Sequence, residues 1–129
     1  MITFRIEKDV KREVKRLLDK HKWFWWCPPA NAYGKSGISD FHAVRGGVFM
    51  AIETKMSPNK PTAMQEGFLG SIKAEGGFAF VVTEKTVSWF AVWLQAFDAA
   101  TAATAAGSEP TPEDGAAMLN AMHELTGDY

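Results

Sequence analysis

The chain lacks several features that would assign it to a familiar class of protein. No apolar run approaches the roughly 18 to 20 residues of a membrane-spanning helix, and the first residues lack the layout of a signal peptide. We therefore expect no membrane partner and a cytoplasmic location in a bacterial or host cell. Cys27 is the single cysteine, so an internal disulfide is excluded.

Metal and thiol chemistry based on histidine or cysteine is also poorly represented. The three histidines, His21, His42 and His123, show none of the spacings that zinc sites use. Cys27 has no obvious paired base in its surroundings, so a role in packing is favoured over a role as a nucleophile. These absences direct attention to the carboxylates.

What is present indicates one small folded domain. The chain has 129 residues, of which 47% are hydrophobic and 22% charged. The net charge of -1 hides an asymmetry, because residues 1–22 are rich in Lys and Arg whereas Lys85 is the one basic residue from position 84 onward. The basic front could face nucleic acid or could be an ordinary solvated helix face.

A predicted hairpin carries the most informative residues. The run from 48 to 56 is rich in β-branched and large apolar residues, which predicts a strand. Gly46 and Gly47 indicate a tight turn that joins it to an antiparallel strand over 41–44. Side chains alternate along a strand, so Glu53 and Lys55 share a face, and Asp40 should lie beside Glu53 at the open end.

Two carboxylates with a nearby ammonium group suit the hydrolysis of a phosphodiester. Mg²⁺ prefers oxygen ligands and commonly takes one or two protein carboxylates together with phosphate oxygens. Lys55 could then orient the attacking water or stabilise the developing charge. Glu-x-Lys alone is a very common pattern, however, and Glu53 and Lys55 could equally be a surface pair beside a capping Asp40.

Three helices are predicted around this hairpin. In residues 6–21 an apolar stripe leaves Glu7 near its centre and Glu13 nearer its flank. A carboxylate on such a stripe is costly unless it meets a cation or a metal, although Glu7 could instead be stabilised by the helix macrodipole. Thr62 is expected to cap a helix to about residue 75, with Gln65 facing the sheet to hold a water, a phosphate or a backbone group.

The remaining segments complete the expected fold. Residues 78–83 read as a buried strand, parallel to its predecessor. Residues 87–106 predict a helix whose apolar surface includes Trp89, Trp93 and Phe97 and should be buried against the sheet or a partner subunit. Residues 107–129 would form a separate helical extension. The aromatic run 23–26 predicts a short strand with alternate rings buried or at a subunit contact, or else a surface that stacks on bases.

The order of these motifs closely resembles the VRR-NUC domain, the virus-type replication–repair nuclease branch of the PD-(D/E)xK superfamily. The resemblance covers roughly residues 6–83. It rests on Gly-x-x-Asp, a strand, a glycine turn, Ile-Glu-x-Lys, Pro-Thr-x-x-Gln, an amphipathic helix, Gly-Gly and an apolar strand. Serine precedes Asp40 where the superfamily name has proline, a position that does not ligate metal.

The resemblance implies an α/β fold with a restriction-endonuclease-like core, in which a mixed central β-sheet is flanked by helices, with extra C-terminal helices. The nuclease-like domain would span 1–106 and the extension 107–129. The resemblance implies a metal-dependent DNA endonuclease, structure-selective on branched DNA such as a four-way junction, and a homodimer. A non-catalytic DNA-binding or assembly module with the same fold is the alternative.

The resemblance also distributes roles among residues. It implies that Mg²⁺ or Mn²⁺ is held by Asp40, Glu53 and a carboxylate of the first helix, with Glu7 as the first choice and Glu13 as the second. It also implies that Lys55 and Gln65 complete the catalytic set. It implies DNA contacts from the loop before Asp40 and from Lys60 in the loop after the Glu53 strand. The expected loop contacts are Tyr33, Gly34, Lys35 and Ser36.

Overall fold

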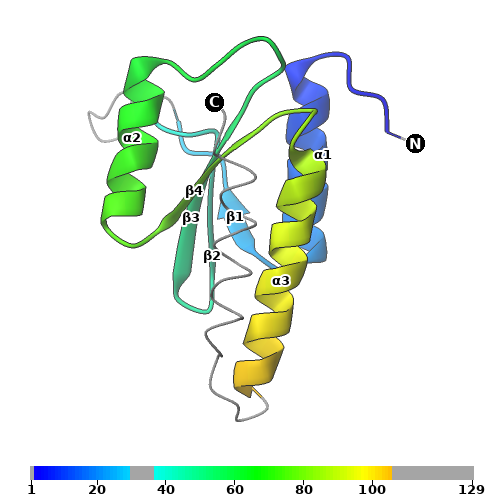
Figure 1. Ribbon diagram of the computed structural model, residues 1–129, viewed down its shortest axis with the longest axis vertical. Coiled ribbons are helices and arrows are strands. Elements are labelled where there is room, and N and C mark those ends of the chain that lie inside the picture. The colour runs from blue at the N-terminus through cyan, green and yellow to red at the C-terminus, as the bar shows by residue number, and fades with distance from the viewer. Residues whose placement is uncertain (1, 30–36, 106–129) are drawn as a thin grey trace.

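The described part of the protein has an α/β fold in which three helices flank a four-stranded mixed sheet (Figure 1). The structure is a computed structural model that describes residues 2–29 and 37–105. The elements follow in the order α1 (Glu7–Lys20), β1 (Phe24–Trp26), β2 (Phe41–Arg45), β3 (Val48–Thr54), α2 (Ala63–Ala74), β4 (Phe78–Val82) and α3 (Val87–Ala105). Each of these was predicted to within a few residues, while the predicted extension 107–129 lies outside the described residues.

The sheet is built outward from the β2–β3 hairpin. Its strand order is β1-β2-β3-β4, with antiparallel pairs up to β3 and a parallel pair between β3 and β4. Gly46 and Gly47 have φ values of +57° and +81°, which a tight hairpin turn requires. Phe41 pairs with Ile52, so Asp40 comes next at the open end of the hairpin, where Glu53 follows Ile52. The predicted antiparallel and parallel pairings are confirmed.

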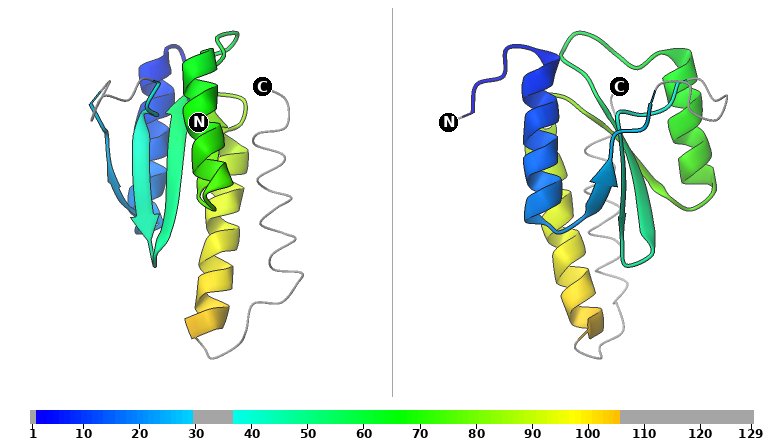
Figure 2. Two further views of the ribbon diagram at one scale, coloured as in Figure 1. Left: turned by 90° about the vertical axis from the view of Figure 1, so that its left-hand side faces the viewer. Right: turned by 180° about the vertical axis from the view of Figure 1, so that it is seen from behind.

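The helices divide between the two faces of the sheet, as Figures 1 and 2 show. Helices α1 and α3 pack on one face, where Met50 and Ile52 of β3 join the larger apolar cluster. Helix α2 covers the other face, where Leu69 packs with Ala51. Because side chains alternate along β3, Glu53 follows Ala51 onto the α2 face. This alternation decides which helix can reach the Glu53 carboxylate.

Helix α3 supplies the aromatic centre of the larger cluster. Trp93 is fully buried, and its ring lies 4.9 Å from that of Phe80 and 5.6 Å from that of Phe97, measured between centroids. The prediction that this helix packs on the sheet is therefore confirmed. Trp89 of the same helix does not pack on the sheet. It is 45% exposed, because it lies roughly 100° around the helix from Phe90.

The aromatic run forms the edge strand β1, as predicted, and its rings alternate. Trp23 is buried in the larger cluster and Trp25 packs against it, whereas Phe24 and Trp26 are exposed. Cys27, which follows β1, is exposed as well. The expectation that this thiol serves packing was wrong, because the chain leaves the sheet after Trp26. Within residues 2–29 and 37–105, no helix has the length and apolar character needed to cross a membrane.

A polar cluster ties the end of α1 to α3 and to the hairpin. His21 is buried, and its Nδ1 lies 2.5 Å from Oδ2 of Asp98 on α3. Arg45 of β2 contacts Asp98 and also donates to the backbone carbonyl of His21 at 2.9 Å. Burial opposes ionisation of Asp98, but hydrogen bonds from Arg45 and His21 outweigh it and lower the pKa of that carboxyl. The cluster holds the end of the fold remote from Asp40.

The two tryptophans of α3 provide a matched test of this packing. Trp93→Ala should lower the free energy of unfolding by about 3–5 kcal/mol, because it empties the aromatic centre. Trp89→Ala should cost about 1 kcal/mol or less, because its ring is largely solvated. Urea unfolding followed by circular dichroism measures both. Equal losses for the two variants would contradict the described orientation of α3.

Candidate active site

The end of β3 carries the two residues that the hairpin pattern singled out. Glu53 is the penultimate residue of β3 and is only 2% exposed. Lys55 follows the strand, and its backbone N–H donates to the carbonyl of Val82 at 3.0 Å, which continues the parallel pairing with β4. Its Nζ lies 3.8 Å from Oε1 of Glu53. The predicted placement of Glu53 and Lys55 on one side of the strand is confirmed.

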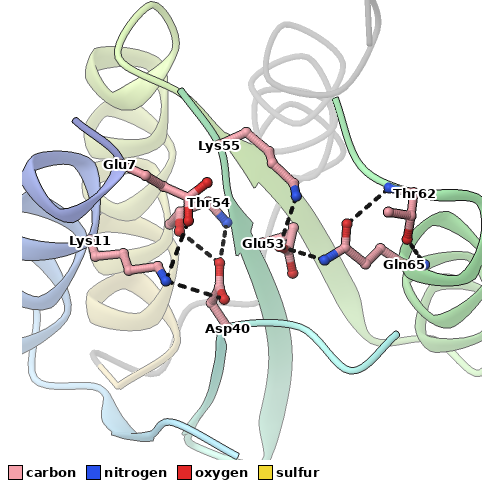
Figure 3. Close-up of polar contacts among 8 residues, drawn as sticks. All are labelled: Glu7, Lys11, Asp40, Glu53, Thr54, Lys55, Thr62 and Gln65. Atoms are coloured by element: carbon pink, nitrogen blue, oxygen red, sulfur yellow. Dashed lines mark hydrogen bonds and ion pairs between the residues drawn. The ribbon is translucent and has the colours of Figure 1, made fainter. Parts of the chain in front are cut away.

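Asp40 is fastened to the end of β3 by its side chain. Its Oδ2 accepts hydrogen bonds from the backbone N–H of Thr54 at 2.9 Å and from the Thr54 hydroxyl at 2.7 Å. These bonds fix the Asp40 carboxylate beside the Glu53 end of β3, as predicted from the hairpin register. Figure 3 shows the two carboxylates next to each other at the centre of the site.

Gln65 of α2 completes the surroundings of Glu53. Its Nε2 donates to Oε1 of Glu53 at 3.0 Å. Its Oε1 accepts the backbone N–H of Thr62 at 2.9 Å, while the Thr62 hydroxyl accepts the backbone N–H of Gln65 at 3.2 Å. This is a reciprocal capping box, so the first turn of α2 is pinned to the site. The predicted cap at Thr62 and the predicted direction of Gln65 are both confirmed.

The second oxygen of the Glu53 carboxylate is the unusual atom of the site. Oε2 is buried, and no donor among the described residues reaches it. Burial and, after it, the charge of Asp40 together raise the pKa of Glu53 to about 8, and the Lys55 ammonium only partly opposes this shift. A buried carboxylate is normally paired, hydrogen-bonded or bound to a metal. Glu53 is therefore short of positive charge, although Lys55 lies nearby.

The carboxylates of α1 lie on the other side of Asp40. Nζ of Lys11 lies 3.4 Å from Oε2 of Glu7 and 3.6 Å from Oδ1 of Asp40. Within the described residues, no three His, Cys, Asp or Glu side chains gather in a way that could hold a metal ion. Glu7, the expected third metal ligand, is thus not grouped with Asp40 and Glu53. The physical reason is that the Lys11 ammonium forms an ion pair with the Glu7 carboxylate and links Glu7 to Asp40 (Figure 3).

Glu13, the second choice for the helix carboxylate, is more buried than Glu7 but is neutralised locally. It is 8% exposed, and both its oxygens accept from Nε of Arg16, at 3.1 and 3.0 Å. It lines a separate cavity between α1 and α3. Of the two helix glutamates, Glu7 is the one that the structure connects to Asp40.

Most of the expected nucleic-acid contacts lie outside the described residues. The four loop residues, Tyr33, Gly34, Lys35 and Ser36, lie outside the described residues. Lys60 is exposed in the loop between β3 and α2, and no carboxylate in the described ranges pairs with it. Its side chain is therefore available to solvent, and its contact with DNA stays a prediction.

The residues present fit a hard divalent cation. Asp40 and Glu53 offer two adjacent carboxylates, and Oε2 of Glu53 is buried without a donor. Mg²⁺ and Mn²⁺ accept oxygen donors, and Mg²⁺ commonly uses one or two carboxylates with substrate phosphate supplying others. Asp40 and Glu53 are therefore the two described acids that could hold such an ion, and Glu7 lies outside their group.

Sequence reasoning missed the roles of Thr54 and Lys11 at the site, and it used Gly37 only as the glycine of the Gly-x-x-Asp pattern. Thr54 stands between Glu53 and Lys55 in the sequence. Because side chains alternate along the strand, the pattern that singled out Glu53 and Lys55 did not indicate that Thr54 bonds to Asp40. Lys11 follows Glu7 by one helical turn, a spacing that could have revealed their contact. Gly37 has a φ of +72°, and a β-carbon there would lie 2.5 Å from the backbone of Met64, so the Asp40 segment passes directly against the start of α2.

No protein-family model matches this chain, and no curated protein matches it either. The resemblance to the VRR-NUC domain is therefore still a prediction. It depends on the order of the motifs and on the convergence of Asp40, Glu53, Lys55 and Gln65 described above.

The raised pKa of Glu53 makes stability depend on pH in a defined direction. The unfolded chain releases this proton near pH 4.5, but the folded protein keeps it to about pH 8. Between these values the folded state binds more protons, so this group makes the protein less stable as pH rises. Relative to Glu53→Gln, the wild type should lose up to about 1.4 kcal/mol per pH unit across this window.

Chemical unfolding in EDTA at several pH values measures this difference. Glu75→Gln removes an exposed glutamate of the same chain and serves as the control, whose difference from the wild type should stay nearly constant. A flat difference between wild type and Glu53→Gln from pH 5 to pH 8 would show that Glu53 is not held in the described environment.

The tight passage at Gly37 gives a second test. Gly37→Ala should destabilise the protein more than Gly46→Ala, although both residues have positive φ. Each alanine pays the left-handed cost of about 1–2 kcal/mol. Only at Gly37 does the added methyl group collide with the backbone of Met64, since nothing lies within 4 Å of the same position at Gly46. Thermal unfolding compares the two, and equal losses would contradict the contact.

Proposed function

We propose that this protein is a Mg²⁺- or Mn²⁺-dependent DNA endonuclease with a restriction-endonuclease-like core, related to the VRR-NUC domain. The observation that carries the proposal is the buried Glu53 carboxylate, which has one oxygen without a donor and stands beside Asp40, Lys55 and Gln65. The mixed sheet with helices on both faces fits the architecture that the resemblance implies.

In this proposal the chain's own groups have separate tasks. Asp40 and Glu53 would hold the divalent cation, which supplies a more acidic bound water and positive charge at the phosphate. Gln65 donates to Oε1 of Glu53 and so leaves Oε2 as the oxygen available for the cation. Thr54 holds Asp40 in position through two hydrogen bonds.

Lys55 is the proposed partner of the reacting groups. Its side chain is 16% exposed, so the ammonium is largely withdrawn from water yet lies next to Glu53. An ammonium group so placed can donate to the attacking water and orient it, or stabilise negative charge that develops on the phosphate. Its attachment to the end of β3 keeps it beside the acids without a flexible loop.

The substrate class follows from the resemblance. We propose branched DNA, with a four-way junction as the test case, and a homodimer that can cut two strands symmetrically. Selectivity would come from DNA shape, because the described part of the chain carries no separate recognition domain. Action on DNA would take place in the cytoplasm of a bacterial or host cell.

One observation favours the alternative of a non-catalytic DNA-binding or assembly module. Both oxygens of Asp40 already have protein partners, Lys11 at Oδ1 and Thr54 at Oδ2. In that case the cluster would be a structural tie between α1 and β3. The buried oxygen of Glu53, which such a tie leaves without a partner, is the reason that we place the enzyme first.

A nicking assay tests the enzyme directly. The wild type should cleave DNA with Mg²⁺ or Mn²⁺, cleave a four-way junction faster than linear duplex of the same sequence, and stop in EDTA. Glu53→Gln should abolish cleavage because it removes a ligand charge, and Lys55→Met should reduce kcat by about 100-fold or more. Glu75→Gln removes an exposed glutamate that has no role in the proposal, and it is the matched control for Glu53→Gln.

The possible failures separate the two proposals. If the wild type and Glu53→Gln are equally inert while DNA binding persists, the module is correct. Cleavage that continues in EDTA would contradict a role for the cation. Equal cleavage rates on junction and linear DNA would contradict the proposed preference for branched DNA but not the proposed nuclease activity.

A further inference from the structure

A second cavity opens beside Asp40 on the side of α1. Its volume is about 220 Å³, room for roughly seven waters at about 30 Å³ each. One wall is α1 and another is the segment that leads into β2, while Cys27 and Pro28 close the end nearest β1. Because Asp40 borders both this cavity and the candidate active site, whatever occupies the cavity lies next to the acids.

Among the described residues, Lys15 supplies the one positive charge of the lining that has no acidic partner. The lining contains two ammonium groups, Lys11 and Lys15, and one carboxylate, Asp40. The Asp40 charge is already compensated, since Lys11 lies 3.6 Å from Oδ1 and Thr54 donates twice to Oδ2. An anion that enters therefore meets little repulsion from this acid.

The two lysines differ in their ion pairing with carboxylates. Lys11 is bound to Glu7 and Asp40; burial lowers its pKa, but the charges of these acids outweigh this and raise it. Lys15, one turn further along α1, has no carboxylate partner among the described residues. Its side chain is exposed, and its Nζ lies 6.0 Å from the centre of the Trp25 ring, at the outer limit of a cation–π contact. Lys15 is thus a cation beside the cavity whose charge has no acidic partner among the described residues.

We propose that this cavity binds a backbone phosphate of the DNA, adjacent to the phosphate that is cut, with Lys15 as its principal contact. The inference rests on the proposed function and adds to it a substrate-binding subsite on α1. A phosphate is the ligand of choice because ammonium groups recognise the charge of the nucleic-acid backbone irrespective of base sequence. Lys15 acts as a positioning residue here, since it holds DNA in register with Asp40.

The chain contains its own reporter for occupancy of the cavity. Cys27 is the single cysteine, it is exposed, and it lines the cavity. Modification by a thiol reagent such as DTNB, followed in EDTA, therefore reads out this position alone and needs no catalysis. A 20-base-pair duplex should slow the modification in proportion to the fraction of protein bound, and binding is measured in parallel by fluorescence anisotropy.

Variants of α1 make the test specific. Lys15→Gln should lose the protection of Cys27 and should lower the slope of log Kd against log salt by about one unit. Lys15→Arg, which keeps the charge, should restore both. Lys20→Gln removes an exposed lysine of the same helix that borders the other cavity, and it should behave as the wild type.

The outcomes separate this proposal from the proposed function. If DNA binds but Cys27 is modified at an unchanged rate, and Lys15→Gln binds like Lys20→Gln, the subsite is refuted. Absence of DNA binding refutes it as well. If DNA protects Cys27 but no Mg²⁺-dependent cleavage occurs, the subsite is supported and the endonuclease is contradicted. If DNA is cleaved but Cys27 is not protected, the endonuclease is supported and the subsite is contradicted.

Discussion

The two hydrogen bonds from Thr54 to Oδ2 of Asp40 close the open end of the β2–β3 hairpin, opposite its glycine turn. An aspartate that precedes a strand would otherwise be free to point into solvent. Here it is tied to the residue that follows Glu53, so the spacing of the two acids is determined by the ladder itself. The remainder of the site is arranged around this tie, with α1 on one side and α2 on the other.

The charges around the two acids are distributed unevenly, and this asymmetry has physical consequences. Lys11 and Thr54 satisfy Asp40, whereas Glu53 has Gln65 and a more distant Lys55 on one oxygen and no donor on the other. The deficit of positive charge is therefore concentrated at Glu53, and burial with the nearby Asp40 charge raises the pKa of this carboxyl to about 8. In the proposed nuclease a divalent cation would take the place of the proton on Glu53.

Much of the site could be predicted because it follows local rules. The Gly46–Gly47 turn and the two-residue alternation place Glu53 and Lys55 together, and the cap at Thr62 directs Gln65 toward the sheet. Contacts that depend on packing between elements were not predictable in the same way. The exposure of Trp89, the tie at Thr54 and the bridge through Lys11 are set by how α1, α3 and the sheet meet, which no single segment encodes.

The contact with Glu53 also explains why residue 65 is a glutamine, a choice that helix capping alone leaves open. At the third position of a capping box, glutamate and glutamine serve equally well, since only the side-chain oxygen accepts the backbone N–H of the cap. In this protein the other end of the same side chain must donate to Glu53, and only an amide has both an acceptor and a donor. A glutamate at position 65 would preserve the helix start but add a negative charge beside Glu53 and Asp40, so the neutral residue is required by its neighbour on β3.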